Sequence, residues 1–90
     1  MLVSVIDNEE KHVHEDGTIE YRCSGQVHRD NGPALIFPDG TKKWYYFGLP
    51  HRLNGPAVIY PDGSEEWVVN GNRIPDDEIK LLKLKLIGEL

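Results

Sequence analysis

A unit of 23 residues that occurs twice in succession is the feature that most constrains how this 90-residue chain can fold. Residues 25–47 read GQVHRDNGPALIFPDGTKKWYYF and residues 48–70 read GLPHRLNGPAVIYPDGSEEWVVN, and 12 of the 23 aligned pairs are identical. A period between about 20 and 50 residues is typical of repeat architectures, in which each unit packs against its neighbours. The sequence therefore predicts an array of similar units within a single domain, residues 1–90.

Two turn sequences alternate with short apolar segments inside each unit. The glycines of Asn-Gly-Pro and Pro-Asp-Gly are expected to take positive φ in tight turns. The segments between them predict strands at Ala34–Phe37, Lys42–Phe47, Ala57–Tyr60 and Glu65–Asn70. Turn signals this closely spaced leave no room for crossover helices, so neighbouring strands should pair antiparallel. The predicted fold class is mainly β, an antiparallel β-meander of hairpin repeats.

The segment before the two units resembles them weakly. When the 23-residue frame is extended backwards, Asp16-Gly17-Thr18 aligns with Asp39-Gly40-Thr41 and Tyr21 aligns with Trp44. Residues 2–24 are therefore interpreted as a degenerate copy at one end of the array. Within it, Leu2–Ile6 predicts a first strand and residues 7–11 a polar loop.

The segment after the two units, residues 71–90, is expected to cap the other end. Pro75 and three acids at 76–78, followed by lysines at 80, 83 and 85 and by Gly88, predict a helix over Asp76–Leu86. Its apolar side would carry Ile79, Leu82 and Leu86. The period-two alternation over residues 82–86 leaves a strand as the alternative.

Composition and charge narrow the class of protein. No apolar stretch of about 20 residues is present, and Met1–Ile6 lacks the basic leader and cleavage site of a signal peptide, which predicts a soluble protein without a membrane span. A lone Cys23 cannot form an internal disulfide, so we expect a cytoplasmic location. The net charge of −5, with −4 in residues 1–24, provides no basic stripe and argues against nucleic-acid binding.

The repeated motif carries a family likeness. The pattern Gly-x-x-His-Arg-x-x-Gly-Pro-Ala…Pro-Asp-Gly…Trp resembles MORN-type repeats, in particular the variant found in small phage and giant-virus proteins and in antitoxin-like bacterial proteins. The resemblance covers Asp16 to about Gly71. It implies a hairpin-repeat fold and a role in protein docking, scaffolding or membrane attachment, in the host cytoplasm if the protein is viral.

The sharpest chemical pattern is a ladder of two His-Arg pairs, His28-Arg29 and His51-Arg52. Stacked strands would separate the imidazoles by about 9 to 10 Å, too far for one metal ion to bind both. We therefore expect the arginines to hydrogen-bond the Asp39 and Asp62 turns or neighbouring carbonyls. No nucleophile, catalytic carboxylate pair or cofactor motif is recognisable, which argues against an enzyme and for no cofactor or metal.

The aromatic and aliphatic residues of the repeats point to another class of function. Side chains alternate sides along a strand, so one face of the sheet would hold the shared alanine, isoleucine and tryptophan positions. The other face would be apolar as well, and the C-terminal helix could cover only part of it. Exposed apolar surface of that kind marks interfaces. The residues expected near the contact are Leu35, Phe37, Tyr45, Phe47, Val58, Tyr60 and Val68.

The hypothesis that follows is a non-catalytic protein-interaction module, a phage-encoded accessory protein or inhibitor of host defence, that binds another protein or a second copy of itself as a homodimer. Two alternatives stay open at this point. One is a ligand- or metal-binding protein that uses the His-Arg ladder, and the other is an acidic mimic of nucleic acid.

Overall fold

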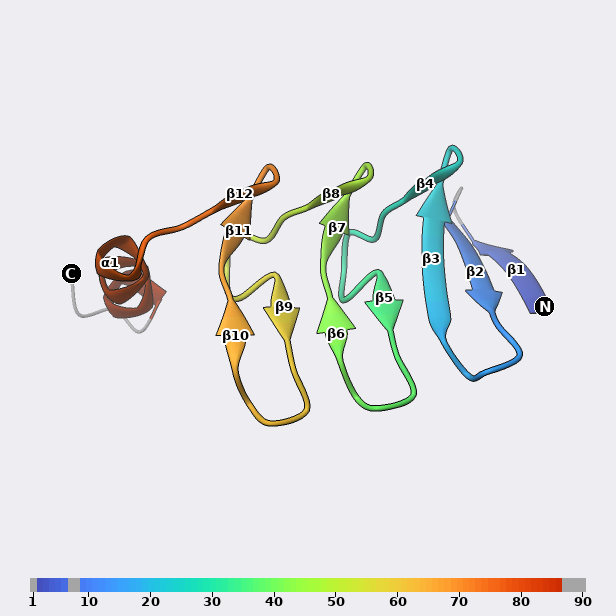
Figure 1. Ribbon diagram of the computed structural model, residues 1–90. Coiled ribbons are helices and arrows are strands. Elements are labelled where there is room, and N and C mark those ends of the chain that lie inside the picture. Colours follow the sequence, from blue (N-terminus) through green and yellow to red (C-terminus); the bar gives the residue numbers. More distant parts are fainter. Residues whose placement is uncertain (1, 7–8, 87–90) are drawn as a thin grey trace.

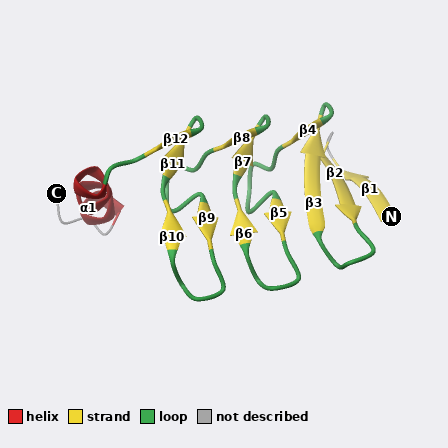
Figure 2. Ribbon diagram, viewed as in Figure 1, coloured by secondary structure: helices red, strands yellow, loops and turns green. Residues whose placement is uncertain are grey.

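The computed structural model describes residues 2–6 and 9–86, and the side chains of residues 9–85. The strands are β1 (Leu2–Ile6), β2 (Glu9–Val13), β3 (Ile19–Cys23), β4 (Gln26–Val27), β5 (Leu35–Ile36), β6 (Lys42–Lys43), β7 (Tyr45–Tyr46), β8 (Leu49–Pro50), β9 (Val58–Ile59), β10 (Glu65–Glu66), β11 (Val68–Val69) and β12 (Asn72–Arg73), and the helix is α1 (Asp76–Leu86). The expected class, mainly β with antiparallel hairpins and a C-terminal helix, is confirmed (Figure 2).

The hairpins stand side by side in a row, with β1 at one end and α1 at the other (Figure 1). The main sheet has the order β1-β2-β3-β5-β6-β9-β10, with β4 attached to β3, and β7-β8 and β11-β12 form two small sheets beside it. All strand pairs in the described part of the chain are antiparallel. The result is an elongated array of 43 × 28 × 22 Å. No helix in the described part of the chain is long and apolar enough to cross a membrane.

The lower edge of the array in Figure 1 consists of three equivalent turns, one in each unit. The Oδ1 atoms of Asp16, Asp39 and Asp62 accept the N–H groups of residues 18, 41 and 64 at 2.9, 2.8 and 2.9 Å. These are side-chain turns in which aspartate replaces a backbone acceptor. Residues 2–24 therefore keep the turn of the two full units although most of their motif is lost.

The upper edge carries a second set of equivalent turns, each made by two consecutive residues at positive φ. The pairs are Ser24-Gly25 (φ 53° and 79°), Phe47-Gly48 (45° and 85°) and Asn70-Gly71 (50° and 81°). Two positive φ values in succession define the type I′ turn, whose twist matches that of a β-hairpin. Glycine and asparagine suit this geometry, whereas a bulky residue such as phenylalanine rarely adopts it.

Each long strand expected from the sequence is divided at its tryptophan. Below Trp44, β6 pairs with β5 and β9, and above it β7 pairs with β8. The N–H of Trp44 donates to Ala57 O at 2.7 Å and its carbonyl accepts from His51 N at 3.1 Å. The strand thus changes partners at this residue, and Trp67 divides β10 from β11 in the same way. The regular segments are accordingly shorter than the four to six residues that we expected.

The core is a thin layer where neighbouring units meet. The buried apolar residues of the described part are Ala34, Ala57, Val58, Trp67 and Val68. Both alanines are fully buried, and their N–H groups donate to the carbonyls of Lys43 and Glu66 at 2.8 Å. A larger side chain would have to displace the adjacent hairpin, because packed interiors leave no free volume. Close packing of neighbouring hairpins therefore requires a residue as small as alanine at the last position of Asn-Gly-Pro-Ala.

Two expectations about local conformation were wrong. The polar loop expected at residues 7–11 is replaced, from Glu9 onwards, by strand β2. Pairing of β2 with β1 and β3 outweighs the low strand propensity of Glu9, Glu10 and Lys11. Residues 7–8 lie outside the described part. Gly55 does not take positive φ, whereas Gly63 does, at 90°. Gly55 is needed for space instead, since a Cβ built there would lie 2.8 Å from Cζ and Nη1 of Arg52.

The helix α1 spans the residues that the sequence predicted, Asp76–Leu86, and the strand alternative is excluded. Ile79 and Leu82 are half-buried, as expected for the side that faces the array; the side chain of Leu86, and Gly88, lie outside the described residues. Lys83 Nζ lies 5.9 Å from the centre of the Trp67 ring and 3.8 Å from Glu65 Oε1. These contacts attach the helix to the last hairpin of the array.

A buried carboxylate on β3 makes stability depend on pH. Burial raises the pKa of Glu20, but hydrogen bonds from Arg22 and His14 outweigh burial, so the pKa lies below its ordinary value of 4.5. A carboxylate with a lowered pKa stabilises the fold above that ordinary value, and the contribution is lost as the pH falls through the folded-state pKa. We expect the melting temperature to fall below about pH 4.5, and Glu20→Gln to be less stable than the parent at pH 7 but to differ little at pH 2. Circular-dichroism melts from pH 7 to pH 2 measure this, and a gap between the two proteins that does not narrow in acid would contradict it.

Candidate functional site

The two repeated histidines fasten consecutive hairpins together. Nδ1 of His28 accepts the N–H of Phe47 at 3.0 Å, and Nδ1 of His51 accepts the N–H of Asn70 at 2.9 Å. In both cases the donor is the first residue of the type I′ turn of the following hairpin. An imidazole that accepts at Nδ1 carries its proton at Nε2 when it is neutral. The histidine ladder is therefore built into the connections between units, with Nε2–H available as a donor.

The two repeated arginines have an equivalent structural role. Nη1 of Arg29 donates to Pro33 O at 3.3 Å, and Nη1 of Arg52 donates to Pro56 O at 3.1 Å. The guanidinium carbons lie 3.8 Å from the Tyr21 ring centre and 4.0 Å from that of Trp44, respectively. The expectation that the arginines bond neighbouring carbonyls is confirmed. Each guanidinium is held between an aromatic ring and a glycine of the Asn-Gly-Pro loop.

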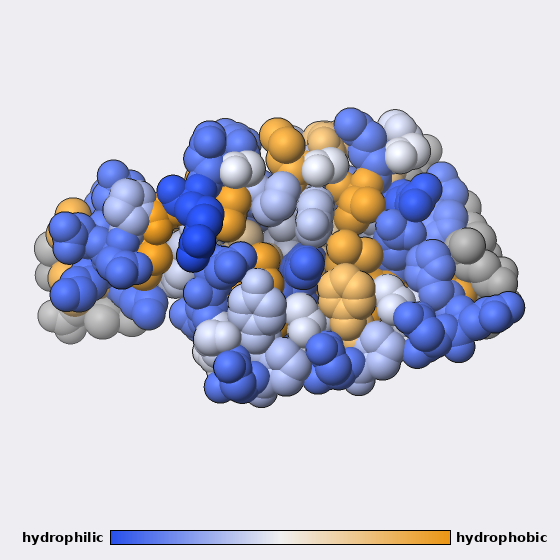
Figure 3. Space-filling model, viewed as in Figure 1, coloured by the Kyte–Doolittle hydropathy of each residue, from blue (hydrophilic) through white to orange (hydrophobic). Residues whose placement is uncertain are grey.

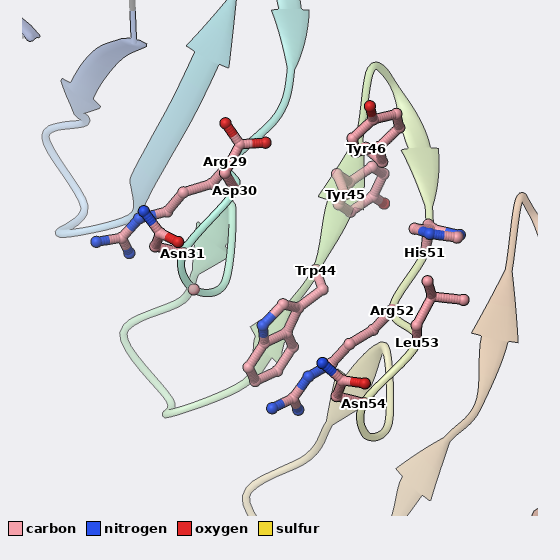
Figure 4. A pocket seen from close by; sticks show the side chains of 11 residues that line it. Arg29, Asp30, Asn31, Trp44, Tyr45, Tyr46, His51, Arg52, Leu53 and Asn54 are labelled. Carbon is pink, nitrogen blue, oxygen red and sulfur yellow. The ribbon is translucent and has the colours of Figure 1, made fainter. Parts of the chain in front are cut away.

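An open pocket of about 410 Å³ lies between the loops of the two full units (Figure 4). The strand that carries Trp44, Tyr45 and Tyr46 runs between the two loops. The other lining residues are Arg29, Asp30, Asn31 and Gly32 from the first loop, and His51, Arg52, Leu53 and Asn54 from the second. The pocket thus combines aromatic rings with amide, imidazole and guanidinium donors. Within the described part of the chain, no three His, Cys, Asp or Glu side chains are grouped as metal ligands.

An apolar patch adjoins this pocket at and near the β7–β8 turn. We call it the turn patch; its exposed members are Tyr46, Phe47, Leu49 and Leu53, with exposed fractions of 49%, 41%, 49% and 63%. Figure 3 shows hydrophobic surface along the upper edge of the array above this hairpin. The rings of Tyr46 and Phe47 lie 4.9 Å apart, and Phe47 stacks on His28 at 4.1 Å. The patch is therefore held in place by contacts within the array. Leu81 and Leu84 are exposed separately on α1.

The equivalent positions of the neighbouring units are mostly polar. Phe47 corresponds to Ser24 and Asn70, and Leu49 corresponds to Gln26 and Asn72. Leu53 corresponds to Asp30. Because the same backbone geometry accepts polar residues in the adjacent units, the fold does not require apolar side chains here. Tyr46 is the exception, because it corresponds to Cys23 and Val69.

The structure separates the residues that the sequence had grouped as a contact surface. Val58 and Val68 are buried, with exposed fractions of 6% and 5%, so the expectation that they lie on an open face is wrong for these two. They pack inside the array because neighbouring hairpins cover them. Leu35, Phe37, Tyr45 and Tyr60 are half-buried, and Phe47 is exposed in the turn patch. The sequence reasoning missed Tyr46, Leu49 and Leu53. Comparison of the variable positions of the two units would have identified the two leucines.

A comparison of the chain with protein-family models, with curated protein sequences and with solved structures finds no match.

Proposed function

We propose that this protein is a non-catalytic interaction module that docks on a partner protein through the turn patch. The observation that carries the proposal is that four apolar side chains are exposed together. At most of the equivalent positions in the adjacent units the residue is polar. Exposed apolar groups cost solubility and are retained where they bind something. Tyrosine and phenylalanine are also enriched in the cores of protein interfaces.

Backbone strain at the same place supports the proposal. Phe47 holds φ at 45°, a conformation that bulky residues rarely adopt, whereas Asn70 at the equivalent turn suits it. Strained residues of this kind gather at binding and catalytic sites, where function outweighs the local cost. The hydrogen bond from Phe47 N–H to His28 keeps the turn in position before any partner binds. A pre-organised surface loses less entropy on association.

The resemblance of the 23-residue unit to MORN-type repeats agrees with this role, because such arrays serve as docking scaffolds. On that resemblance we propose an accessory protein of phage or bacterial origin that acts in the cytoplasm. The described residues of the repeats are used for packing rather than for chemistry, since the histidines and arginines of both motifs bond the backbone. This favours a binding role over catalysis.

The test compares the turn patch with the rest of the surface. A photo-crosslinking phenylalanine analogue at position 49 or 53 is expected to capture the partner in cells, and the same analogue at the exposed Lys42 on β6 is not. The Phe47→Asn, Leu49→Asn double variant takes the residues of the next unit and should keep the melting temperature, because surface changes cost at most about 0.5 kcal/mol each. We expect it to bind the captured partner at least about 30-fold more weakly, the loss typical of contact hot spots.

Sedimentation equilibrium of the purified parent and of the double variant then identifies the kind of complex. A dimeric parent and a monomeric double variant would make the partner a second copy of this chain. A monomeric parent would place the patch against a different protein. Equal partner binding by the parent and a folded double variant would contradict the proposed function.

A further inference from the structure

The pocket and the turn patch form one continuous surface, because Tyr46 and Leu53 belong to both. A partner segment that covers the patch must therefore also pass over the pocket. At about 410 Å³ the pocket is large enough for one side chain and its neighbouring backbone. The chemistry of its lining then indicates which side chain fits. This inference rests on the proposed function and specifies the partner.

The second unit lacks an acceptor that the first unit has. In the first unit, Nε2 of His28 bonds Oδ1 of Asp30 at 2.9 Å. The residue equivalent to Asp30 in the second unit is Leu53, which cannot accept a hydrogen bond. His51 nevertheless uses Nδ1 in the same way as His28, so its proton also lies at Nε2. In the described part of the chain that N–H has no acceptor.

Arg52, like His51, lacks a partner that its equivalent in the first unit has. Nε of Arg29 lies 3.7 Å from Oε1 of Glu9, whereas Arg52 forms no ion pair with any described residue. Its Nη1 donates to Pro56 O, and its remaining N–H groups have no hydrogen-bond acceptor in the described part of the chain. Burial lowers the pKa of Arg52, and Glu65 only partly offsets this. Among the described residues, the pocket is thus lined by a guanidinium without an ion-pair partner, that of Arg52, and by an unpaired neutral donor on the adjacent His51.

We propose that the pocket binds an aspartate or glutamate side chain of the partner, so that the partner segment carries a carboxylate next to an apolar residue that covers the turn patch. A single negative charge matches a single guanidinium that lacks an ion-pair partner, and charge-assisted hydrogen bonds to arginine are stronger than those between neutral groups. The pocket lining itself contains one carboxylate, that of Asp30, which is hydrogen-bonded to His28. The turns that contain the Asp-Gly sequences lie at the opposite edge of the array (Figure 1).

The chain itself offers a matched pair of variants for the test. Leu53→Asp and Leu53→Asn both remove the leucine from the turn patch, and both side chains have nearly the same size. Only Leu53→Asp supplies a carboxylate where the first unit has Asp30, which bonds the ring of His28. The new carboxylate is therefore expected to accept from Nε2 of His51 and to add one negative charge to the lining of the pocket. A difference in peptide affinity between the two variants measures the effect of charge in the pocket. A loss of affinity that both variants share measures the contribution of the apolar turn patch.

Phage-displayed random short peptides are selected on the full-length parent, and binders are measured by isothermal titration calorimetry. We expect selected peptides to carry an acid beside an aromatic or aliphatic residue. Leu53→Asp should bind them at least about tenfold more weakly than Leu53→Asn does. Changing the peptide acid to its amide should weaken binding to the parent and to Leu53→Asn, but not to Leu53→Asp.

Failure of the inference and failure of the proposed function give different results. The carboxylate pocket would be contradicted if the peptides lose the same affinity for Leu53→Asp as for Leu53→Asn and also tolerate the change of acid to amide. The docking function of the turn patch would remain supported by that result. If no peptide is selected, or if the selected peptides bind both variants as tightly as the parent, the docking function is contradicted and this inference with it. Titration with inorganic phosphate and with a nucleoside monophosphate completes the test. Binding to the parent that is lost in Leu53→Asp would reassign the pocket to a phosphate ligand.

Discussion

Replacing Trp67 by alanine is expected to lower the free energy of unfolding by about 3 kcal/mol, the loss typical of a large buried aromatic side chain. Trp67 is only 5% exposed and has the largest side chain among the buried residues of the described part. It lies where the last hairpin meets the helix, with its carbonyl accepting from Ile74 N–H at 2.8 Å and its ring facing Lys83. A domain of this length has a total stability of about 5 to 13 kcal/mol, so the loss is a large fraction of it.

Urea denaturation followed by circular dichroism measures this effect without depending on tryptophan fluorescence. The control is Lys42→Ala, an exposed position where the change should be less than about 0.5 kcal/mol. Hydrogen exchange adds a local readout, since amides of α1 should exchange faster once the contact with Trp67 is removed. Urea midpoints for Trp67→Ala and Lys42→Ala that coincide would contradict the assignment of Trp67 to the core.

A second large effect is expected for Gly55→Ala, although Gly55 has no unusual backbone conformation. The added Cβ would lie 2.8 Å from the guanidinium of Arg52, which must then leave its place over the Trp44 ring and release Pro56 O. Loss of a partly buried cation–π contact and a charge-assisted hydrogen bond costs about 1 to 3 kcal/mol. Because the cost arises through Arg52, the Arg52→Ala, Gly55→Ala double variant should be about as stable as Arg52→Ala alone.

Gly63→Ala is the matched control for this double-mutant cycle. Gly63 has φ at 90° with no atom within 4 Å of a Cβ, so its substitution costs backbone strain of about 1 kcal/mol and does not involve Arg52. Its effect should add to that of Arg52→Ala, as effects at independent sites do. Chemical denaturation of all five variants provides the comparison. Additive losses at Gly55 and Arg52 would mean that the glycine is not needed to make room for the guanidinium.

Features that depend on a few consecutive residues could be predicted from the sequence. The Asp-Gly turns at 39–40 and 62–63 follow from local hydrogen bonding by the aspartate, and α1 follows from its acidic start and basic end. The degenerate unit was found in the same way, from Asp16-Gly17-Thr18. Such signals act over distances shorter than one hairpin, so they do not require knowledge of what lies beside them.

The candidate site could not be predicted in this way, because it depends on which side chains of different units meet. The role of His51 is set by a turn 19 residues further along the chain, and that of Gly55 by a guanidinium that folds back against it. Sequence periodicity assigned Val58 and Val68 to an open face, whereas the adjacent hairpins bury both.

By itself, the sequence determined the repeat length, the turns, the antiparallel hairpins and the capping helix, because each is encoded by local conformational preference repeated at a fixed interval. Only the tertiary structure decided which apolar residues are covered and which remain exposed. Stacking brings every hairpin against its neighbours, so apolar residues at equivalent positions, such as Leu35 and Val58, are buried to different extents. The turn patch and the pocket arise from that difference, since burial and pairing are properties of the array rather than of one unit.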